Sequence, residues 1–248
     1  RSLVGSEMCI RDSLEGVYLV GGGEYGLTPV GNGCNVYFIH GGKESALIDA
    51  GSGVGTAKIL ENILEEGFDP MNIRYLFLTH FHFDHIGGAH EIKRITNCKI
   101  AIHEYESDKL ESLSQETLVE YSPISIVPPK VDIKLRGGEK FKVGKHTLEI
   151  IHTPGHTLGS VCILMRNNGK KILFSGDTVF ARGRIGWFNT PTCSIEKYKE
   201  SLKKLLELKP DVLLPGHGTF ILSDATHHIR LLLNKLDVPW KCIITTLD

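Results

Sequence analysis

The sequence predicts a mixed α/β fold, an αββα sandwich in which two mixed sheets pack together and are flanked by helices. Strand and helix patterns alternate along the chain, and this order occurs twice, as expected of sheets that are covered by helices. The segment from Ile195 to Leu208 has apolar residues at the spacing of a helix that lies on a sheet. A chain of 248 residues, 41% of them hydrophobic, can bury one ample core.

The first half of the chain begins with short apolar strands, and the Gly-rich turns between them indicate hairpins. A later strand carries the continuous apolar run Tyr75–Leu78, which is typical of a strand buried on both faces. The predicted elements of this half are strands over residues 16–20, 35–40, 45–50, 73–80 and 98–103, and helices over residues 55–66 and 89–96.

The second half repeats the pattern. Its predicted elements are strands over residues 139–143, 146–152, 161–165, 171–176 and 212–216, and helices over residues 195–208 and 224–236. The segment from Leu113 to Lys130, between the two halves, is apolar but has no clean period. It is either a crossover connection, which we favour, or a lid over a functional site.

Seven side chains with metal-binding chemistry follow one another along the chain, each in or beside a Gly-containing turn. Four of them crowd into six residues of the motif THFHFDHIGG, and packing them without a metal would cost on the order of several kcal/mol of desolvation. The candidates are His80, His82, Asp84 and His85 in this motif, His156 in HTPGHTLGS, Asp177 in FSGDT and His217 in PGHG. Together they are enough to hold two metal ions.

The spacing inside the first motif has a physical meaning. The motif lies just past the end of the strand over residues 73–80, and an extended chain projects His80 and His82 to the same side, where they can bind one ion. Asp84 and His85 come where the chain must turn, and they can bind a second ion. The two glycines that follow allow the backbone to approach closely before a helix begins.

In their order, these motifs resemble the metallo-β-lactamase superfamily of hydrolases, and the resemblance covers the chain from about Gly16 onward. It implies a first metal site made of His80, His82 and His156 and a second made of Asp84, His85 and His217. It further implies that Asp177 bridges the two ions. Asp49, in ALIDAG, and Thr79 would orient the ligands from behind, since ligating histidines usually donate their other ring N–H to an oxygen.

The resemblance implies a dinuclear hydrolase in which a metal-bridging hydroxide attacks an ester, thioester or lactone. Two adjacent cations lower the pKa of bound water toward roughly 7 and clamp the attacking and leaving oxygens. Asp84 and Asp177 would keep the hydroxide oriented and receive a proton. The chain has no GxSxG motif, so we expect no serine nucleophile.

The ligand set also narrows the branch of the superfamily. A bridging aspartate at Asp177 resembles glyoxalase II and the acyl-homoserine lactonases, whereas one lactamase subclass has a cysteine there and the other dinuclear lactamases lack the bridge. We therefore do not expect antibiotic hydrolysis. We expect two Zn²⁺ ions, with Fe or Mn as alternatives because ligand type alone does not fix the metal.

Two other functions stay open for the same fold. One is a mononuclear iron enzyme that resembles the persulfide dioxygenases, although such an enzyme would not need all seven ligands. The other is a metal-binding module without turnover. The intact Asp84 and Asp177 argue against the module, because structural zinc is satisfied by four closed ligands.

Substrate contacts are predicted in the segment ARGRIGWFNTPTCS, which follows Asp177 closely. Arg182 and Arg184 would provide a basic anchor, and Trp187 and Phe188 would form a wall for an acyl group. An equally simple interpretation is that these aromatic side chains only pack the loop.

The first thirteen residues, RSLVGSEMCIRDS, match the translation of a sequencing-library adaptor. We therefore expect residues 1–13 to be non-native and residues 14–248 to form a single domain. On this interpretation native N-terminal residues, including a signal peptide, could be missing.

Composition limits the partners of the protein. Its 28 Lys and Arg residues balance 29 Asp and Glu residues, which gives a net charge of −1 and no field suited to tracking phosphates. We therefore expect a small-molecule substrate, no nucleic acid and, since no apolar run is long enough, no membrane. Six cysteines without a disulfide spacing pattern favour a cytoplasmic location. A homodimer is left open.

Overall fold

The computed structural model describes residues 14–22, 25–28, 33–186 and 192–237. The strands of the first sheet are β1 (Val17–Gly21), β2 (Val36–His40), β3 (Ser45–Ile48), β4 (Ile73–Phe77), β5 (Lys99–His103) and β6 (Ile133–Leu135). Its helices are α2 (Thr56–Glu65), α3 (Phe83–Ile86), α4 (Ala89–Thr96) and α5 (Glu104–Ser112). The second sheet contains β7 (Lys140–Val143), β8 (His146–His152), β9 (Val161–Asn167), β10 (Lys170–Gly176) and β11 (Val212–Pro215), and its helices are α6 (Ile195–Leu208) and α7 (Ala225–Asp237).

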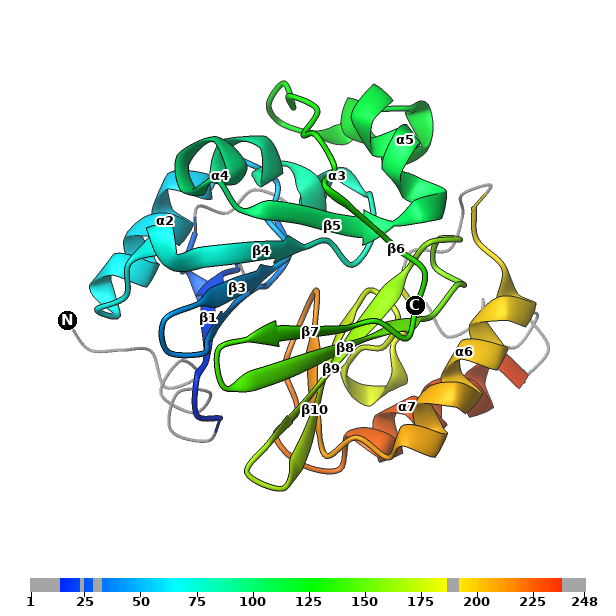
Figure 1. Cartoon of the computed structure of the whole chain (residues 1–248). Helices are drawn as coiled ribbons and strands as arrows, with labels where there is room; N and C mark the ends of the chain where they lie inside the picture. The colour runs from blue at the N-terminus through cyan, green and yellow to red at the C-terminus, as the bar shows by residue number, and fades with distance from the viewer. Residues whose placement is uncertain (1–13, 23–24, 29–32, 187–191, 238–248) are drawn as a thin grey trace.

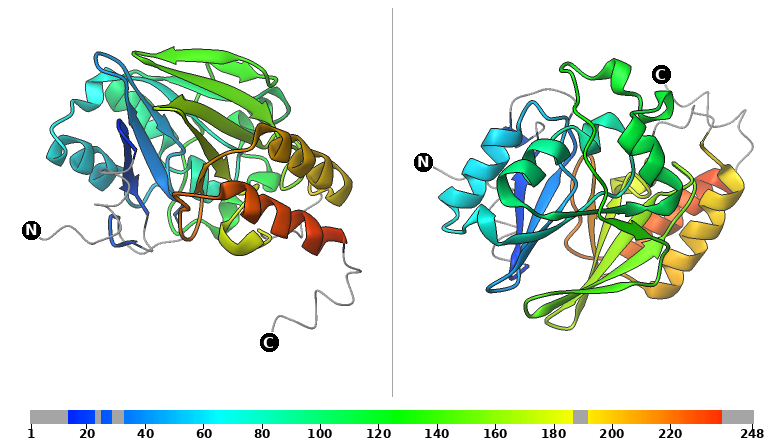
Figure 2. Two further views of the ribbon diagram at one scale, coloured as in Figure 1. Left: turned by 90° about the horizontal axis from the view of Figure 1, so that it is seen from below. Right: turned by 45° about the horizontal axis from the view of Figure 1, so that its top comes forward.

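Both sheets are mixed, as predicted. The first follows the order β1-β2-β3-β4-β5-β6, antiparallel from β1 to β3 and parallel from β3 to β6. The second follows the order β11-β10-β9-β8-β7, in which only the pair β10 and β11 is parallel. In Figures 1 and 2 the helices lie on the outer faces of the two sheets, which face each other. The αββα sandwich is thus confirmed.

The alternation of side chains along the strands explains the layers. In β9, Ile163 and Met165 lie in the core between the sheets, whereas Cys162 and Leu164 pack toward α6 and α7. In β2, Tyr37 lies in the core between the sheets and its neighbours pack toward the helices of the first sheet. Each sheet is therefore apolar on both faces, which a four-layer arrangement buries.

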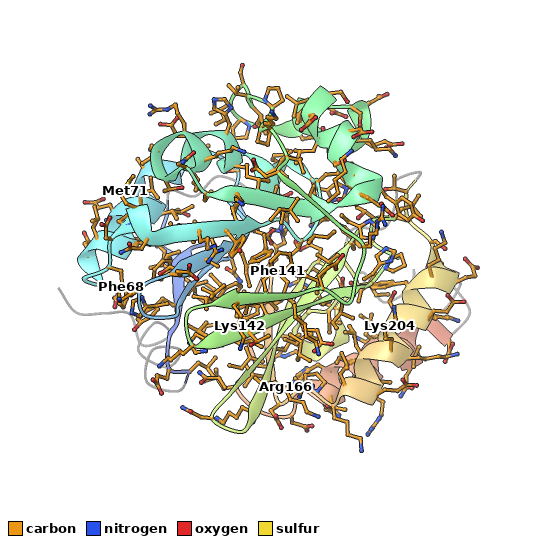
Figure 3. All side chains as sticks on the ribbon, in the orientation of Figure 1. Phe68, Met71, Phe141, Lys142, Arg166 and Lys204 are labelled. Atoms are coloured by element: carbon orange, nitrogen blue, oxygen red, sulfur yellow. The ribbon has the colours of Figure 1, made fainter. Side chains whose placement is uncertain are left out.

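Aromatic rings join the two sheets. Phe141 of β7, labelled in Figure 3, meets the rings of Tyr75 and Phe77 edge-on at centroid distances of 5.4 and 5.0 Å. Such tilted pairs stabilise a core beyond the burial of their area. They fix β7 against β4, the strand that leads into the motif THFHFDHIGG.

The structure confirms every predicted strand and helix, and it contains elements that were not predicted. These are the 3₁₀ turns, the strand β6 and the helices α3 and α5. The predicted strand over residues 73–80 ends earlier, at Phe77, because the backbone N–H of Thr79 bonds to the side chain of Asp49 and the chain bends. The segment from Leu113 to Lys130 consists mainly of loop and two 3₁₀ turns, η3 (Gln115–Thr117) and η4 (Val119–Tyr121).

Two further predictions can be compared with the described residues. The cysteines among them, Cys34, Cys98, Cys162 and Cys193, are all free thiols, as expected. None of the helices in the described ranges has the length and apolar character needed to cross a bilayer.

Candidate metal centre

Strand ends and the turns that follow them bring all seven candidate ligands to one place at the edge of both sheets. His80 and His82 follow β4, and Asp84 and His85 lie on the single turn of α3. The second sheet supplies the other three, His156 from the turn between β8 and β9, Asp177 directly after β10 and His217 directly after β11. The carboxyl ends of β4, β10 and β11 thus point to one site.

Three histidines form a first set. The Nε2 atoms of His80 and His156 lie 3.1 and 3.0 Å from Nδ1 of His82, and all three side chains are buried. Zinc binds imidazole nitrogen at about 2.0–2.1 Å, which places the nitrogens around one tetrahedral ion about 3.3 Å apart. The three nitrogens therefore converge as the ligands of a single ion do.

Asp84, His85 and His217 form a second set. Oδ2 of Asp84 lies 2.9 Å from Nε2 of His217 and 3.7 Å from Nε2 of His85. Asp177 lies between the sets, because its Oδ1 is 3.3 Å from Nε2 of His85 and its Oδ2 is 3.7 Å from Nε2 of His156. One carboxylate oxygen therefore faces each set, which is the arrangement that a bridging ligand needs.

Asp49 holds the first motif from behind. Its Oδ1 accepts the backbone N–H of Thr79 at 2.8 Å, and its Oδ2 accepts the Thr79 hydroxyl at 2.9 Å. The same Oδ2 lies 2.9 Å from Nδ1 of His85, which leaves Nε2 of that ring directed at the second set. Oγ1 of Thr79 also lies 3.1 Å from Nδ1 of His80. Asp49 and Thr79 thus have the positions that the sequence predicts for residues that orient ligands.

The surroundings make the first set neutral and the second set charged, because neighbouring acidic groups raise the pKa values of His85 and His217 against the effect of burial. An ion bound by the second set would displace protons from these two rings. Burial lowers the pKa of His82 to about 3 and holds the pKa of His80 well below its usual range, so both rings are neutral and offer a lone pair. Burial would raise the pKa of Asp177, but the rings of His217 and His85 outweigh it and hold the pKa well below the usual value. The pKa of Asp84 is lowered against the effect of burial by the same two rings.

The donors fit a divalent cation. Among the described residues, Nε2 of His85 and Oδ1 of Asp177 are buried at the centre, 3.3 Å from each other, and neither makes a hydrogen bond of good geometry. Buried polar atoms normally have a partner, and neutral imidazoles with carboxylates are a ligand set that zinc and other first-row metals accept. The residues present therefore fit a divalent cation.

Glycines allow the close packing of the ligand-bearing turns. A Cβ on Gly87 would lie 2.2 Å from the backbone of Ser52, and one on Gly88 would lie 2.5 Å from the carbonyl oxygen of Ala50. The close backbone approach expected after the motif is confirmed. A Cβ on Gly216, next to His217, would lie 2.6 Å from Oδ1 of Asp177.

We expect the substitution Gly216→Ala to lower metal affinity at least about tenfold, because the added methyl group displaces Asp177 and so misplaces a ligand by a fraction of an ångström. The φ of Gly216 lies outside the left-handed region, so alanine causes no backbone strain there and the fold should persist. Metal titration and circular dichroism of both proteins check this expectation. Wild-type affinity in the variant would contradict the tight packing of this turn against the centre.

The turn that carries His217 is held by the first sheet. The backbone N–H of Asn35 donates to the carbonyl oxygen of Gly216 at 2.6 Å. The side-chain amide of Asn35 donates to the carbonyl oxygen of Pro215 at 3.0 Å. The buried hydroxyl of Tyr37 donates to the same Pro215 oxygen at 2.8 Å. The position of His217 thus depends on residues about 180 positions earlier in the chain.

Glu106, a residue that the sequence did not single out, connects two ligand-bearing segments. It lies on α5, its side chain is buried, and it accepts hydrogen bonds from the hydroxyl of Thr157 and, at 3.0 Å, from the backbone N–H of Gly159. Burial raises the pKa of Glu106 to about 8, against the effect of Thr157 and of the backbones of Gly159 and Phe81. Phe81 lies between His80 and His82, and Thr157 follows His156.

Two cavities lie at the centre. The smaller, of about 240 Å³, is lined by five of the ligands and by the apolar side chains of Leu118, Phe180 and Ile185. Leu118 belongs to the segment for which a lid was considered, so this segment contributes to the wall. Arg184 also lines this cavity, and Arg182 lines only the larger one beside it. Trp187 and Phe188, the predicted acyl wall, lie outside the described residues.

A family model described as the metallo-beta-lactamase superfamily matches residues 29–217, which is most of the chain. The chain belongs to the metallo-β-lactamase superfamily. Its likeness to a solved structure agrees with this assignment, since a metallo-beta-lactamase family protein from Thermus thermophilus matches 95% of this chain and 84% of its own, with a TM-score of 0.75 and 22% identity.

Relatives from the superfamily have been named as hydrolases. A probable metallo-hydrolase, MJ0888 from Methanocaldococcus jannaschii, is 35% identical over 77% of this chain and 91% of its own length. The acyl-coenzyme A thioesterase MBLAC2 from Bos taurus is 28% identical over 86% of this chain and 82% of its own length. The protein is therefore a metal-dependent hydrolase of the metallo-β-lactamase superfamily, as the motifs predict.

Proposed function

We propose that the protein is a dinuclear, zinc-dependent thioesterase. The observation that carries this proposal is the position of Asp177, whose two carboxylate oxygens face two separate sets of ligand atoms. A single ion would leave one set without a role. The likeness to a named acyl-coenzyme A thioesterase favours thioesters within the wider class of esters, thioesters and lactones.

His80, His82 and His156 would hold one ion, Asp84, His85 and His217 the other, and Asp177 would contact both. Divalent ions bound there lower the pKa of water toward roughly 7 and polarise a carbonyl oxygen. This chemistry suits attack by water on a thioester, in which the carbon–sulfur bond breaks and a carboxylic acid and a thiol are released.

The chain's own carboxylates position the water and take up its proton. Asp84 and Asp177 are ionised because the pKa of each is lowered, and their side chains are 17% and 11% exposed. They therefore reach the cavity as hydrogen-bond acceptors for a water molecule. We assign the proton to Asp84, because it is the more exposed of the two carboxylates.

The cavity suits an acyl group beside the reacting carbonyl. Leu118, Phe180 and Ile185 provide apolar surface next to the ligands, in a space of about 240 Å³. Such walls exclude bulk water from the thioester and strengthen the electrostatic effect of the nearby charges.

Metal analysis of the purified protein, combined with turnover of acyl thioesters, tests the proposal. We expect about two zinc ions per chain, hydrolysis of thioesters of N-acetylcysteamine, and loss of nearly all activity after chelation with recovery on adding zinc. One iron per chain, with oxygen uptake on a persulfide and no hydrolysis, would replace this proposal by the dioxygenase alternative.

A further inference from the structure

A second cavity, of about 420 Å³, opens beside the metal centre. Phe180, Arg184 and His217 line both this cavity and the smaller one, so the two spaces adjoin at a metal-centre residue. The smaller cavity contains the carboxylates of Asp84 and Asp177, whereas none of the described residues that line the larger one is acidic. The cavity at the metal centre therefore adjoins a space of different charge.

The charge of this second cavity is positive. Arg182 and Arg184 line it, both are exposed, and within the described ranges no carboxylate forms an ion pair with either guanidinium group. Other exposed arginines, such as Arg94 and Arg136, have carboxylate partners on the protein surface. Two guanidinium groups without such partners, in a concave space, are suited to an oxyanion.

The backbone of the cavity wall is held firmly. The backbone N–H of Arg182, which has a φ of +60°, donates to Nδ1 of His228 at 2.7 Å, and Lys235 donates to the carbonyl oxygens of Arg182 and Gly183 at 2.9 Å each. A Cβ on Gly183 would lie 2.7 Å from the backbone nitrogen of Leu232, so this turn lies directly against α7.

The hydrogen bond from the Arg182 N–H determines which ring nitrogen of His228 carries the proton. Burial lowers the pKa of this ring, with a further effect from His227, so the ring is neutral. Because its Nδ1 accepts the Arg182 N–H, its proton is on Nε2. His228 is also among the residues that line the cavity, so its Nε2–H is a third candidate donor beside the two guanidinium groups.

We propose that this second cavity binds the oxyanion of an acidic thioester substrate, with Arg182, Arg184 and His228 as its donors. The proposal rests on the proposed thioesterase function and adds the substrate class. The oxyanion is either a phosphate on the thiol side, as in phosphopantetheine, or a carboxylate at the far end of the acyl group. A carboxylate is planar and a phosphate is tetrahedral, and a guanidinium group can bind either one with two parallel hydrogen bonds.

Two pairs of substrates distinguish the sources. S-acetyl-4′-phosphopantetheine against S-acetylpantetheine tests a phosphate on the thiol side, and succinyl against butyryl N-acetylcysteamine tests a carboxylate on the acyl side. We expect kcat/KM to be at least about tenfold higher for the charged member of one pair, mainly through KM, because a charge-assisted hydrogen bond contributes this much or more. Equal values within both pairs would overturn the proposal.

The variants Arg182→Gln and Arg184→Gln assign the preference to this cavity. Each should lower the ratio of kcat/KM between charged and neutral substrates by about threefold or more, and the double variant should abolish the preference. Arg166→Gln is the matched control, since Arg166 is an exposed arginine near the hairpin end of β9 and β10, opposite to the end that leads to Asp177 (Figure 3). A preference that both cavity variants retain would place the oxyanion site elsewhere.

A binding measurement separates this proposal from the thioesterase function. Titration calorimetry of the metal-loaded protein with 4′-phosphopantetheine and with succinate needs no turnover. Binding of one of them that weakens about tenfold in Arg182→Gln supports the cavity even if no thioester is hydrolysed. Hydrolysis of neutral thioesters without any such binding would leave the thioesterase intact and refute the oxyanion site.

Discussion

Replacing Asp84 with asparagine is expected to lower kcat for thioester hydrolysis by about a thousandfold or more, with the fold retained. Asparagine has the shape of aspartate but cannot take up a proton, and it is a weaker ligand for a divalent ion. Asp84 is the more exposed of the two carboxylates in the centre, and its Oδ2 lies 2.9 Å from Nε2 of His217. The substitution therefore removes both a ligand and the acceptor of the proton.

Steady-state kinetics and metal content, measured together, decide between these two roles. A variant that keeps both metals and loses turnover shows that Asp84 acts on the water, whereas one that loses a metal shows that it acts as a ligand. The matched control is Asp108→Asn, because that carboxylate is 85% exposed on α5, where it contacts Ser107 and Lys134. Wild-type turnover in Asp84→Asn would contradict the proposed mechanism.

Replacing Glu106 with alanine is expected to lower the free energy of unfolding by about 2–4 kcal/mol and to weaken metal binding. The substitution leaves a cavity and removes the buried partner of the Thr157 hydroxyl and the Gly159 N–H. Thr157 and Gly159 follow His156 closely in the chain, so losing their hydrogen bonds to Glu106 makes the position of His156 less fixed. Glu106→Gln keeps the size and the acceptor oxygen, and its effect should be much smaller. Urea unfolding and metal titration of the three proteins check both expectations.

The dependence of stability on pH gives a second measurement on Glu106. Burial raises its pKa in the folded protein to about 8, whereas the unfolded chain titrates near 4.5. The folded state therefore favours the protonated carboxyl, and this contribution is complete below pH 4.5 and is lost as the pH rises to about 8. In chelator-treated protein, stability relative to Glu106→Gln should fall across this window by at most about 5 kcal/mol. Parallel curves for the two proteins would show that burial leaves the pKa of Glu106 at its value in the unfolded chain.

The sequence predicts that the seven candidate ligands converge, because their geometry is local or linked to strand ends. The residues from His80 to His85 come within one turn after a strand, so their convergence needs only a bend at Thr79. His156, Asp177 and His217 each lie in a turn that contains glycine at the end of a strong strand pattern. The apolar runs of these strands fix the sheets, and the sheets then bring the turns together.

What the sequence could not predict depends on contacts between distant segments. The helix α5 has few apolar residues and no clear amphipathic pattern, so nothing in its sequence shows that Glu106 is buried. The sequence predicts Arg182 and Arg184 as a basic anchor, but it does not show that His228 of α7, about 46 positions after Arg182, lines the same cavity. The substrate assignment of Trp187 and Phe188 stays a prediction. The start of α5 is marked by His103, whose ring accepts the backbone N–H of Tyr105 and so caps the helix that carries Glu106.

The ligands come from two separate sheets, and this has a consequence for folding. Four of them follow β4, and the other three follow β8, β10 and β11, so an ion held by both groups closes loops of roughly a hundred residues. Closing loops of that length in the unfolded chain is costly in entropy, and an ion that binds only the assembled turns acts as a cross-link between the halves of the molecule. The concentration of available metal in the cell would therefore determine the folded fraction of the protein as well as its rate of turnover.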